Sequence, residues 1–306
     1  GLYWIIALFG AAILLICGLV SPSEVLNGLT ADTEINPLKI LALFLSMTFL
    51  SVFLDEVGFF RYLAGKAIER ARSNQILLFL IIYFLTAILT VFTSNDVVIL
   101  TFTPFICFFC KSAKINPVPY LVGEFAAANT WSMMLIIGNP TNIYLATSAN
   151  ITFTEYFKVM ALPTLAAGIA EFLLILLVFY KKLKKPLDPQ PIIATIESKA
   201  DLIVGLIHMA VCLVFLVISE YIGVPMWLVA AICALSLLLC IVAVRLITRT
   251  KWNYVTDSVK RVPWQLIPFI LSMSVIVISL NVQGISGKIG ELLGDTAPIW
   301  TRSEER

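Results

Sequence analysis

Long apolar runs dominate the chain, and polar residues gather in the shorter stretches between them. Uninterrupted runs of about 20 residues are typical of transmembrane helices, whereas the strands of a membrane barrel alternate over about ten residues. The pattern therefore predicts an all-α polytopic membrane protein. The runs expected to span the bilayer without a break are Leu2–Val20, Leu38–Leu54, Ala161–Tyr180, Leu202–Ser219, Met226–Leu246 and Gln265–Val282.

Two further apolar stretches are interrupted by polar residues. The stretch 75–110 contains Thr93-Ser94-Asn95-Asp96, and the stretch 120–149 contains Gly138-Asn139-Pro140-Thr141-Asn142. An aspartate at bilayer depth costs about 2.5–3.5 kcal/mol on insertion scales, and such residues usually face a cavity or a partner. We therefore expect a hairpin at 75–110 and a broken helix at 120–149. The alternative for Ser94-Asn95-Asp96 is an ordinary surface turn between two helices.

The segment 55–74 differs from the spans because basic residues alternate with apolar ones at helical spacing. Its basic residues are Arg61, Lys66, Arg70 and Arg72. Such a helix lies in the interface, with its apolar face in the membrane and its basic side chains reaching the head groups. The sequence therefore predicts an amphipathic interfacial helix here.

Lysine and arginine collect in the stretches 55–74, 111–114, 181–199 and 245–261. Basic stretches stay in the cytoplasm, so this distribution predicts a cytoplasmic N-terminus. This topology requires both ends of 75–110 to lie on the same side of the membrane. Two full spans and a re-entrant hairpin both satisfy this requirement. The second arm, taken as 97–110, is only 14 residues long, and this length favours the re-entrant hairpin.

The chain also repeats itself with a shift of 226 residues. Leu45-Ser46-Met47 then falls on Leu271-Ser272-Met273, and Pro37 falls on Pro263. Because the charge pattern runs the two matched spans in opposite directions, we expect an inverted repeat, which is typical of secondary transporters. We expect a first half at 1–180, a cytoplasmic linker at 181–200, and the start of a second half at 201–306. The same shift places a second hairpin beyond the last residue, so we expect this chain to lack it.

Composition supports the membrane assignment and argues against an enzyme. Hydrophobic residues make up 60% of the chain and charged residues 13%, against about 25% charged in soluble domains. The spans hold no metal-ligand cluster and no pair of a nucleophile with a base, and His208 is expected to be structural. No cofactor is expected apart from a coupling Na⁺ or H⁺. The cysteines all lie in apolar runs and are expected to be small apolar residues: Cys17, Cys107, Cys110, Cys212, Cys233 and Cys240.

The two interruptions carry the candidate chemistry. A helix broken in the membrane presents free N–H groups and the positive end of its dipole to an anion, while its freed carbonyl groups hold a cation. Glycine allows the turn and proline ends the helix. The candidate substrate- and ion-binding residues are Thr93, Ser94, Asn95, Asp96, Asn129, Thr130, Gly138, Asn139, Pro140, Thr141 and Asn142.

Two sets of these candidates have alternative interpretations. Asp96 is interpreted as a sodium ligand, as a proton carrier, or as the N-cap of the second hairpin arm. Asn129 and Thr130 either face the binding cavity or form hydrogen bonds between helices.

Ser94-Asn95-Asp96, the break Gly138-Asn139-Pro140-Thr141-Asn142-Ile143 and Phe153-Thr154-Glu155-Tyr156 together resemble the ion transporter superfamily. That group includes arsenite-efflux permeases, divalent anion/sodium symporters and citrate carriers. Asp96 stands where the dicarboxylate symporters have threonine, and the chain looks closer to the arsenite permease branch.

The resemblance implies an elevator-like carrier, commonly a homodimer. It also implies a cation site at Ser94, Asn95 and Gly138, which sodium would occupy. Asn139, Thr141 and Asn142 would then face the substrate.

We therefore expect secondary active transport of an anion, or of arsenite or antimonite, driven by a proton or sodium gradient. The alternative in the same class is sodium-coupled uptake of di- or tricarboxylates or sulfate. The alternative from another class is a channel-like membrane subunit of an ATPase-driven pump. The expected location is the inner or plasma membrane, with lipid and the small substrate as partners and no nucleic acid.

Overall fold

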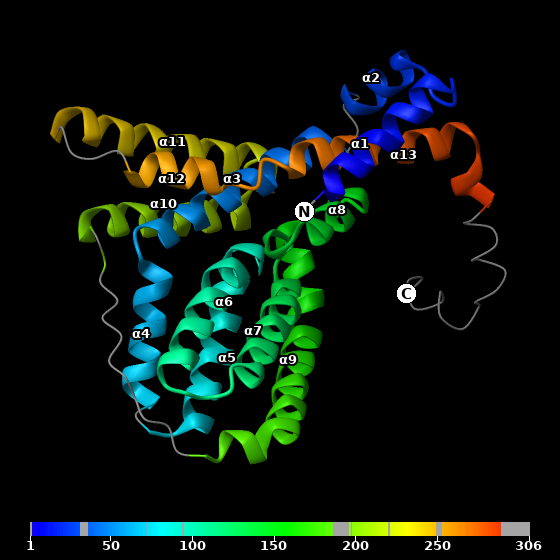
Figure 1. Ribbon diagram of the computed structural model, residues 1–306. Helices are drawn as coiled ribbons and strands as arrows, with labels where there is room; N and C mark the ends of the chain where they lie inside the picture. The colour runs from blue at the N-terminus through cyan, green and yellow to red at the C-terminus, as the bar shows by residue number, and fades with distance from the viewer. Residues whose placement is uncertain are drawn as a thin grey trace. The chain divides into compact units, whose positions relative to one another are not determined.

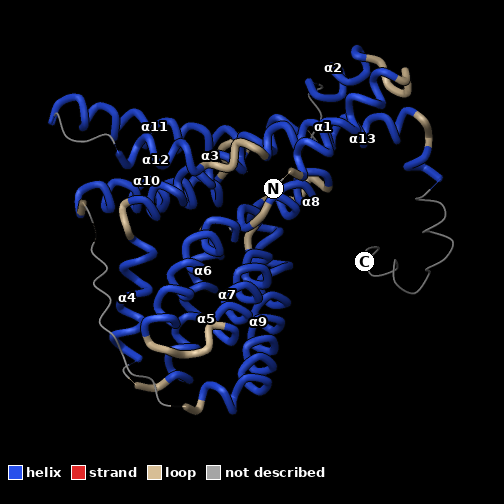
Figure 2. Tube along the Cα trace, viewed as in Figure 1, coloured by secondary structure: helices blue, strands red, loops and turns tan. Residues whose placement is uncertain are grey.

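The computed structural model describes residues 2–30, 36–71, 73–93, 95–185, 196, 198–219, 221–248 and 253–288. Every regular element in these residues is helical, as Figure 2 shows. This confirms the all-α prediction for the described part of the chain. The linker predicted at 181–200 lies largely outside these residues, as does the end of the chain after 288.

The chain forms two compact units, 1–41 with 263–306 and 42–262. In the first unit, α1 (Tyr3–Ile16) and α2 (Pro22–Thr30) pack on α13 (Leu266–Val282). Ala11, Val20 and Val275 form the core of this unit. α1 ends earlier than the predicted Val20 because Gly18 adopts the left-handed φ of +68°, a common way to end a helix.

The second unit holds most of α3 and all of α4 to α12, which Figure 1 labels in chain order. The bounds are α3 Pro37–Glu56, α4 Phe59–Ala71, α5 Gln75–Phe92, α6 Asn95–Ser112, α7 Val118–Trp131, η1 Ser132–Met134, η2 Ile136–Gly138, α8 Pro140–Ser148, α9 Phe153–Leu183, α10 Lys199–Ile218, α11 Met226–Thr248 and α12 Asn253–Arg261.

In the described residues, 6 helical stretches are long and apolar enough to cross a membrane. Five coincide with predicted spans or contain them, and the sixth is α5, the first arm of the predicted hairpin. α1 is apolar but shorter. α6 has 18 residues, which is longer than the 14 that favoured a re-entrant arm. The structure therefore supports a multi-pass membrane protein, while the depth of the hairpin stays a prediction.

Local signals explain where several helices begin. Asn74 accepts hydrogen bonds from the N–H groups of Ile76 and Leu77 at the start of α5. Thr152 and Glu155 form a capping box at the start of α9, and Ser198 caps α10. These side chains replace partners that the first N–H groups of a helix lack.

Helices α5, α7 and α9 pack together around an aromatic cluster. The ring of Phe172 stacks on Phe79 and also contacts Tyr83 and Phe84. The buried hydroxyl of Tyr83 donates to the carbonyl of Gly168 at 2.7 Å, so its polar end is satisfied inside the core. This cluster holds α5 and α9 in fixed positions relative to each other.

Ion pairs fix further helices of the second unit. Arg245 of α11 pairs with Asp201 of α10, and both side chains are buried. Arg261 at the end of α12 pairs with Asp55 at 2.7 Å, and Thr101 of α6 donates to the same carboxylate at 2.8 Å. α6 is thus tied to the end of α3.

Candidate functional site

The tip of the hairpin is the junction between α5 and α6. Thr93 is extended, with φ −132° and ψ −170°, and its hydroxyl donates to the carbonyl of Leu89 at 2.7 Å. Ser94 lies outside the described residues. Asn95 is buried, and Asp96 is exposed in the first turn of α6. A carboxylate in that turn is favoured by the helix dipole. Asp96 is inside the helix, so the N-cap interpretation was wrong.

The second interruption is longer and begins earlier than the sequence predicts. α7 ends at Trp131, two short 3₁₀ turns follow, and α8 begins only at Pro140. Leu135 between the two turns and Asn139 before α8 are extended. The predicted continuation of the helix to Ile137 was therefore wrong. The break consists of the eight residues 132–139 rather than of the predicted Gly138 to Asn142.

Gly138 is required by a close approach of two backbone segments. A Cβ atom placed on it would lie 2.0 Å from the carbonyl oxygen of Ser132. Glycine is the residue that permits such contact. The break is therefore folded back tightly on its own first turn.

Asn139 and Asn142 hold the break together. The Asn139 side chain accepts from the Asn142 N–H at 3.0 Å and so caps α8, with Pro140 following at the first helical position. The Asn142 amide donates to the carbonyls of Ser132 and Leu135 at 2.8 and 3.1 Å. These carbonyls belong to the irregular backbone and need partners when buried. Both asparagines therefore have a structural task here.

The tip and the break are joined by hydrogen bonds. The Asn95 amide donates to the side-chain oxygen of Asn129 at 3.3 Å. The Ser132 hydroxyl donates to the carbonyl of Asn129 at 2.7 Å, and Asn139 donates to that hydroxyl at 3.2 Å. We call the five residues Asn95, Asn129, Ser132, Asn139 and Asn142 the tip–break network.

The candidates on α7, in the break and at the start of α8 differ in exposure. Asn129 and Thr141 are exposed, Thr130 and Pro140 are half-buried, and Gly138 is buried. Asn129 also donates to the carbonyl of Phe125 within α7. Its bond with Asn95 of α6 is a hydrogen bond between helices, as one interpretation expected, while its place in a binding cavity stays a prediction. Within the described residues, the side-chain hydroxyl groups of Thr130 and Thr141 make no hydrogen bond. These two hydroxyl groups are therefore available to solvent or a ligand.

Sequence reasoning missed two polar residues of this region. Ser132 joins three parts of the network but looks like any serine next to a tryptophan. Thr90 of α5 donates to the carbonyl of Ala128 at 3.2 Å, one turn before the tip. The nearest signal in the sequence was the helical spacing of Thr86, Thr90 and Thr93, which places them near one face of α5.

One buried atom of the network lacks a partner. Asn95 is 8% exposed, and its side-chain oxygen makes no hydrogen bond with the described residues. A buried acceptor without a partner costs about 1–3 kcal/mol. The atom therefore marks a place where a donor or a cation would be stabilised.

The site has one charged residue beside an uncharged network. The members of the tip–break network are all uncharged, and Asp96 is the charged residue beside them. Among the described residues no lysine, arginine or histidine joins the network by a hydrogen bond or ion pair. The described residues also hold no cluster of three or more potential metal ligands. Positive potential at the site comes from the first turns of α6 and α8.

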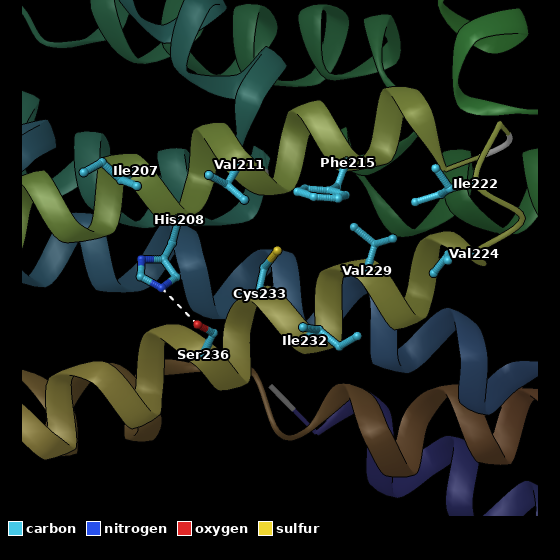
Figure 3. Close-up of a pocket in the computed structure, with 10 residues that line it drawn as sticks. All are labelled: Ile207, His208, Val211, Phe215, Ile222, Val224, Val229, Ile232, Cys233 and Ser236. Atoms are coloured by element: carbon cyan, nitrogen blue, oxygen red, sulfur yellow. Dashed lines mark hydrogen bonds between the residues drawn. The ribbon is translucent and has the colours of Figure 1, made fainter.

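A cavity of about 360 Å³ lies elsewhere, between α10 and α11 (Figure 3). Its lining is apolar except for His208 and Ser236, which hydrogen-bond to each other at 3.3 Å. His208 also contacts the carbonyl of Val204 at 2.8 Å. One ring nitrogen thus has a partner within α10 and the other has a partner on α11. These contacts are in accord with a structural histidine. An apolar cavity of this kind does not suit a small hydrophilic substrate.

Comparison with known proteins gives the family. Residues 2–302 match the citrate transporter family, CitMHS. The arsenical pump membrane protein of Escherichia coli K12 is 27% identical over 301 residues, which are 94% of this chain and 66% of that protein. A second protein of that name from Escherichia coli is 26% identical over 269 residues, 84% of this chain and 60% of that protein.

A further relative is an uncharacterised transporter of Mycobacterium tuberculosis H37Rv. It is 28% identical over 165 residues, which are 54% of this chain and 38% of that protein. The chain thus spans no more than 66% of the length of these relatives. Because the family match extends along almost the whole sequence, the chain belongs to the citrate transporter family of membrane transporters.

Proposed function

We propose that the protein is part of a secondary transporter that moves arsenite or antimonite across the inner or plasma membrane in exchange for protons. The observation that carries this proposal is the unpartnered side-chain oxygen of Asn95 inside an uncharged network. Arsenous acid at neutral pH is an uncharged trihydroxide. Its hydroxyl groups can donate to Asn95 and Asp96, and its oxygens can accept from N–H groups in the first turn of α6 and from the Thr141 N–H at the start of α8.

The same features disfavour a polyvalent anion at this part of the site. Citrate carries several negative charges and would meet the carboxylate of Asp96 without a lysine or arginine in the network. Proteins usually bind carboxylates with arginine, with lysine, or with several N–H groups. The two helix N-termini alone offset little of that charge. Sodium-coupled uptake of carboxylates or sulfate is the second candidate, supported by the name of the family.

The architecture of this proposal follows the predicted one. In it, 75–110 is a re-entrant hairpin whose tip meets the broken helix α7–α8 at membrane depth. A second, inverted half supplies the other side of the site, and two copies form an elevator-like homodimer with cytoplasmic N-termini. The hydrogen bonds between Asn95 and Asn129 and between Ser132 and Asn139 support a shared site.

An uptake panel tests the substrate. The complete gene product is reconstituted into liposomes without ATP or an ATPase partner, and arsenite, sulfate, succinate and citrate are supplied under a pH gradient or a sodium gradient. We expect arsenite uptake that follows the pH gradient and stops when an ionophore collapses it. Citrate or succinate uptake driven by sodium, with no arsenite flux, would support the second candidate instead. Flux that needs an ATPase partner or no gradient would favour a pump subunit or a channel.

Asp96→Asn tests the proton step at the tip. The exposed carboxylate stands at the start of α6 beside Asn95, where it can pass a proton between water and the site. We expect the variant to fold and to lose the dependence of arsenite uptake on pH. Glu69→Gln, on an exposed carboxylate of α4, is the matched control and should keep it. An unchanged pH dependence in Asp96→Asn would rule out this role.

A further inference from the structure

Glu124 is a carboxylate buried between helices that pack side by side. It lies on α7 and is 1% exposed. α7 packs against α5, α6 and α9, and Figure 1 shows α6 beside α7. Its partner among the described residues is the Thr103 hydroxyl of α6, 3.1 Å from one carboxylate oxygen and 3.4 Å from the other.

No positive charge compensates this carboxylate within the described structure. The buried or half-buried titratable residues on the helices packed against α7 are Tyr83 of α5, Cys110 of α6, and Tyr156 and Glu171 of α9. None of them is a cation, and Tyr83 and Glu171 hydrogen-bond to each other. The lysines of α6 and α9 that the structure describes are exposed. An isolated ionised carboxylate is so costly to bury that such groups take up a proton instead.

Glu124 lies where helices pack closely, and few oxygens surround it. A Cβ atom on the preceding Gly123 would come within 2.5 Å of the Phe79 ring, so α5 lies directly against α7 here. The carboxylate and one hydroxyl supply only three oxygens, whereas metal cations held by oxygen take about six or more. A proton is therefore the ligand that fits.

The Thr103 hydroxyl suits both states of the acid. A hydroxyl group rotates freely, so it donates to the carboxylate and accepts from the protonated acid. Lysine or arginine in the same place would hold Glu124 ionised. Thr103 is only half-buried and lies on α6, the helix that begins at the tip. This position gives the buried carboxylate a polar neighbour on a second helix.

We infer that Glu124 is a second proton-binding site of the transporter, which takes up and releases one proton at its side chain with Thr103 as its partner. The step is a simple exchange in which the carboxylate binds a proton from water and later returns it. The chemistry rests on the burial of Glu124, and only its use in transport rests on the proposed function. In this arrangement Asp96 exchanges protons at the exposed tip and Glu124 does so within the helix bundle.

The test is labelling of the full gene product in liposomes with an apolar carbodiimide, which reacts with protonated carboxyl groups in apolar surroundings. Labelled peptides are identified by mass spectrometry across a pH series. We expect Glu124 to be labelled, and we expect this labelling to fall by about tenfold or more as the pH rises. The fall should follow the titration curve of a single group. Exposed Glu69 is the internal control and should stay unlabelled. Absence of label on Glu124 at every pH at which the protein is folded would overturn the inference.

Variants then separate proton binding from transport. Glu124→Gln should remove a carboxylic acid band from the infrared spectrum, and Thr103→Val should shift that band. In the uptake assay Glu124→Gln should weaken the pH dependence of arsenite transport while Asp96 is intact. A folded Glu124→Gln variant with an unchanged infrared spectrum would contradict the inference. If the wild-type protein moved no arsenite, the proposed function would fail, while labelling would still decide on Glu124.

Discussion

Gly138→Ala is expected to abolish most transport, because the new methyl group has no room. Its Cβ atom would lie 2.0 Å from the Ser132 carbonyl oxygen, and Cβ atoms essentially never come within 3.0 Å of another heavy atom. The obstacle is backbone, so rotation of a side chain cannot relieve it. Overpacking costs about 1–3 kcal/mol. If this cost destabilises the transport-competent form of the break, uptake falls by about fivefold to over a hundredfold. The measurement is arsenite uptake at equal protein in the liposomes.

Gly10→Ala is the matched control. A Cβ atom on Gly10 would lie 3.8 Å from a methyl group of Ile276, an ordinary contact, and alanine favours the helix. This variant should keep its uptake and stability. Wild-type uptake by Gly138→Ala would show that the break between Ser132 and Gly138 is not needed in this form.

Arg245→Met is expected to destabilise the protein by about 3–5 kcal/mol, the usual cost of leaving a buried charge without its partner. Arg245 and Asp201 are both 8% exposed and connect the end of α11 to the start of α10. Replacing both by apolar residues, as in Asp201→Leu with Arg245→Met, should recover most of the loss because no charge remains buried. The measurement is the free energy of unfolding in mixed detergent micelles.

A surface pair serves as the control for this cycle. Lys66 and Glu69 of α4 pair at 2.6 Å but are 52% and 58% exposed. Exposed pairs contribute about 0–1 kcal/mol, so Lys66→Met should have little effect. Equal losses for Lys66→Met and Arg245→Met, or a double variant less stable than Arg245→Met, would contradict the account of the buried pair.

The spans and the two interruptions could be predicted from the sequence because they depend on composition and local chemistry. Runs of apolar residues fixed α3, α10 and α11 closely, since a helix must satisfy its own backbone in lipid. Gly138 and Pro140 indicated a break because glycine permits a tight turn of the backbone and proline ends a helix. The pattern of 55–74 likewise predicted the helix α4, while its place at the membrane interface stays a prediction.

The details of the break depend on contacts that a single sequence does not display. α7 stops at Trp131 rather than Ile137 because the freed carbonyls of Ser132 and Leu135 find a partner in Asn142, which lies on the next helix. The apolar residues 133–137 gave no sign of this. Burial was equally hidden, since Glu124 and Asp96 are both carboxylates near apolar residues, yet one is buried and the other exposed.

The pairing of tip and break followed from the resemblance to the ion transporter superfamily more than from periodicity. Asn95 and Asn129 are 34 residues apart in sequence and meet through a hydrogen bond. Helical spacing indicates which residues share a face, but it does not say which faces meet. The role of Ser132 between them follows from tertiary structure alone.

The central claim is that the tip and the break bind one substrate together, and the most direct test is protection of cysteines from a membrane-impermeant thiol reagent. Single cysteines are placed at Ser94 in the tip and at Thr141 in the break of the full gene product. A cysteine substituted for the exposed Tyr144 of α8 is the control. Slowing of its labelling measures the direct reaction of arsenite with thiols. We predict that arsenite slows labelling at both sites with the same half-maximal concentration and that citrate does not. Protection at only one site, or equal slowing at Tyr144, would contradict a shared site.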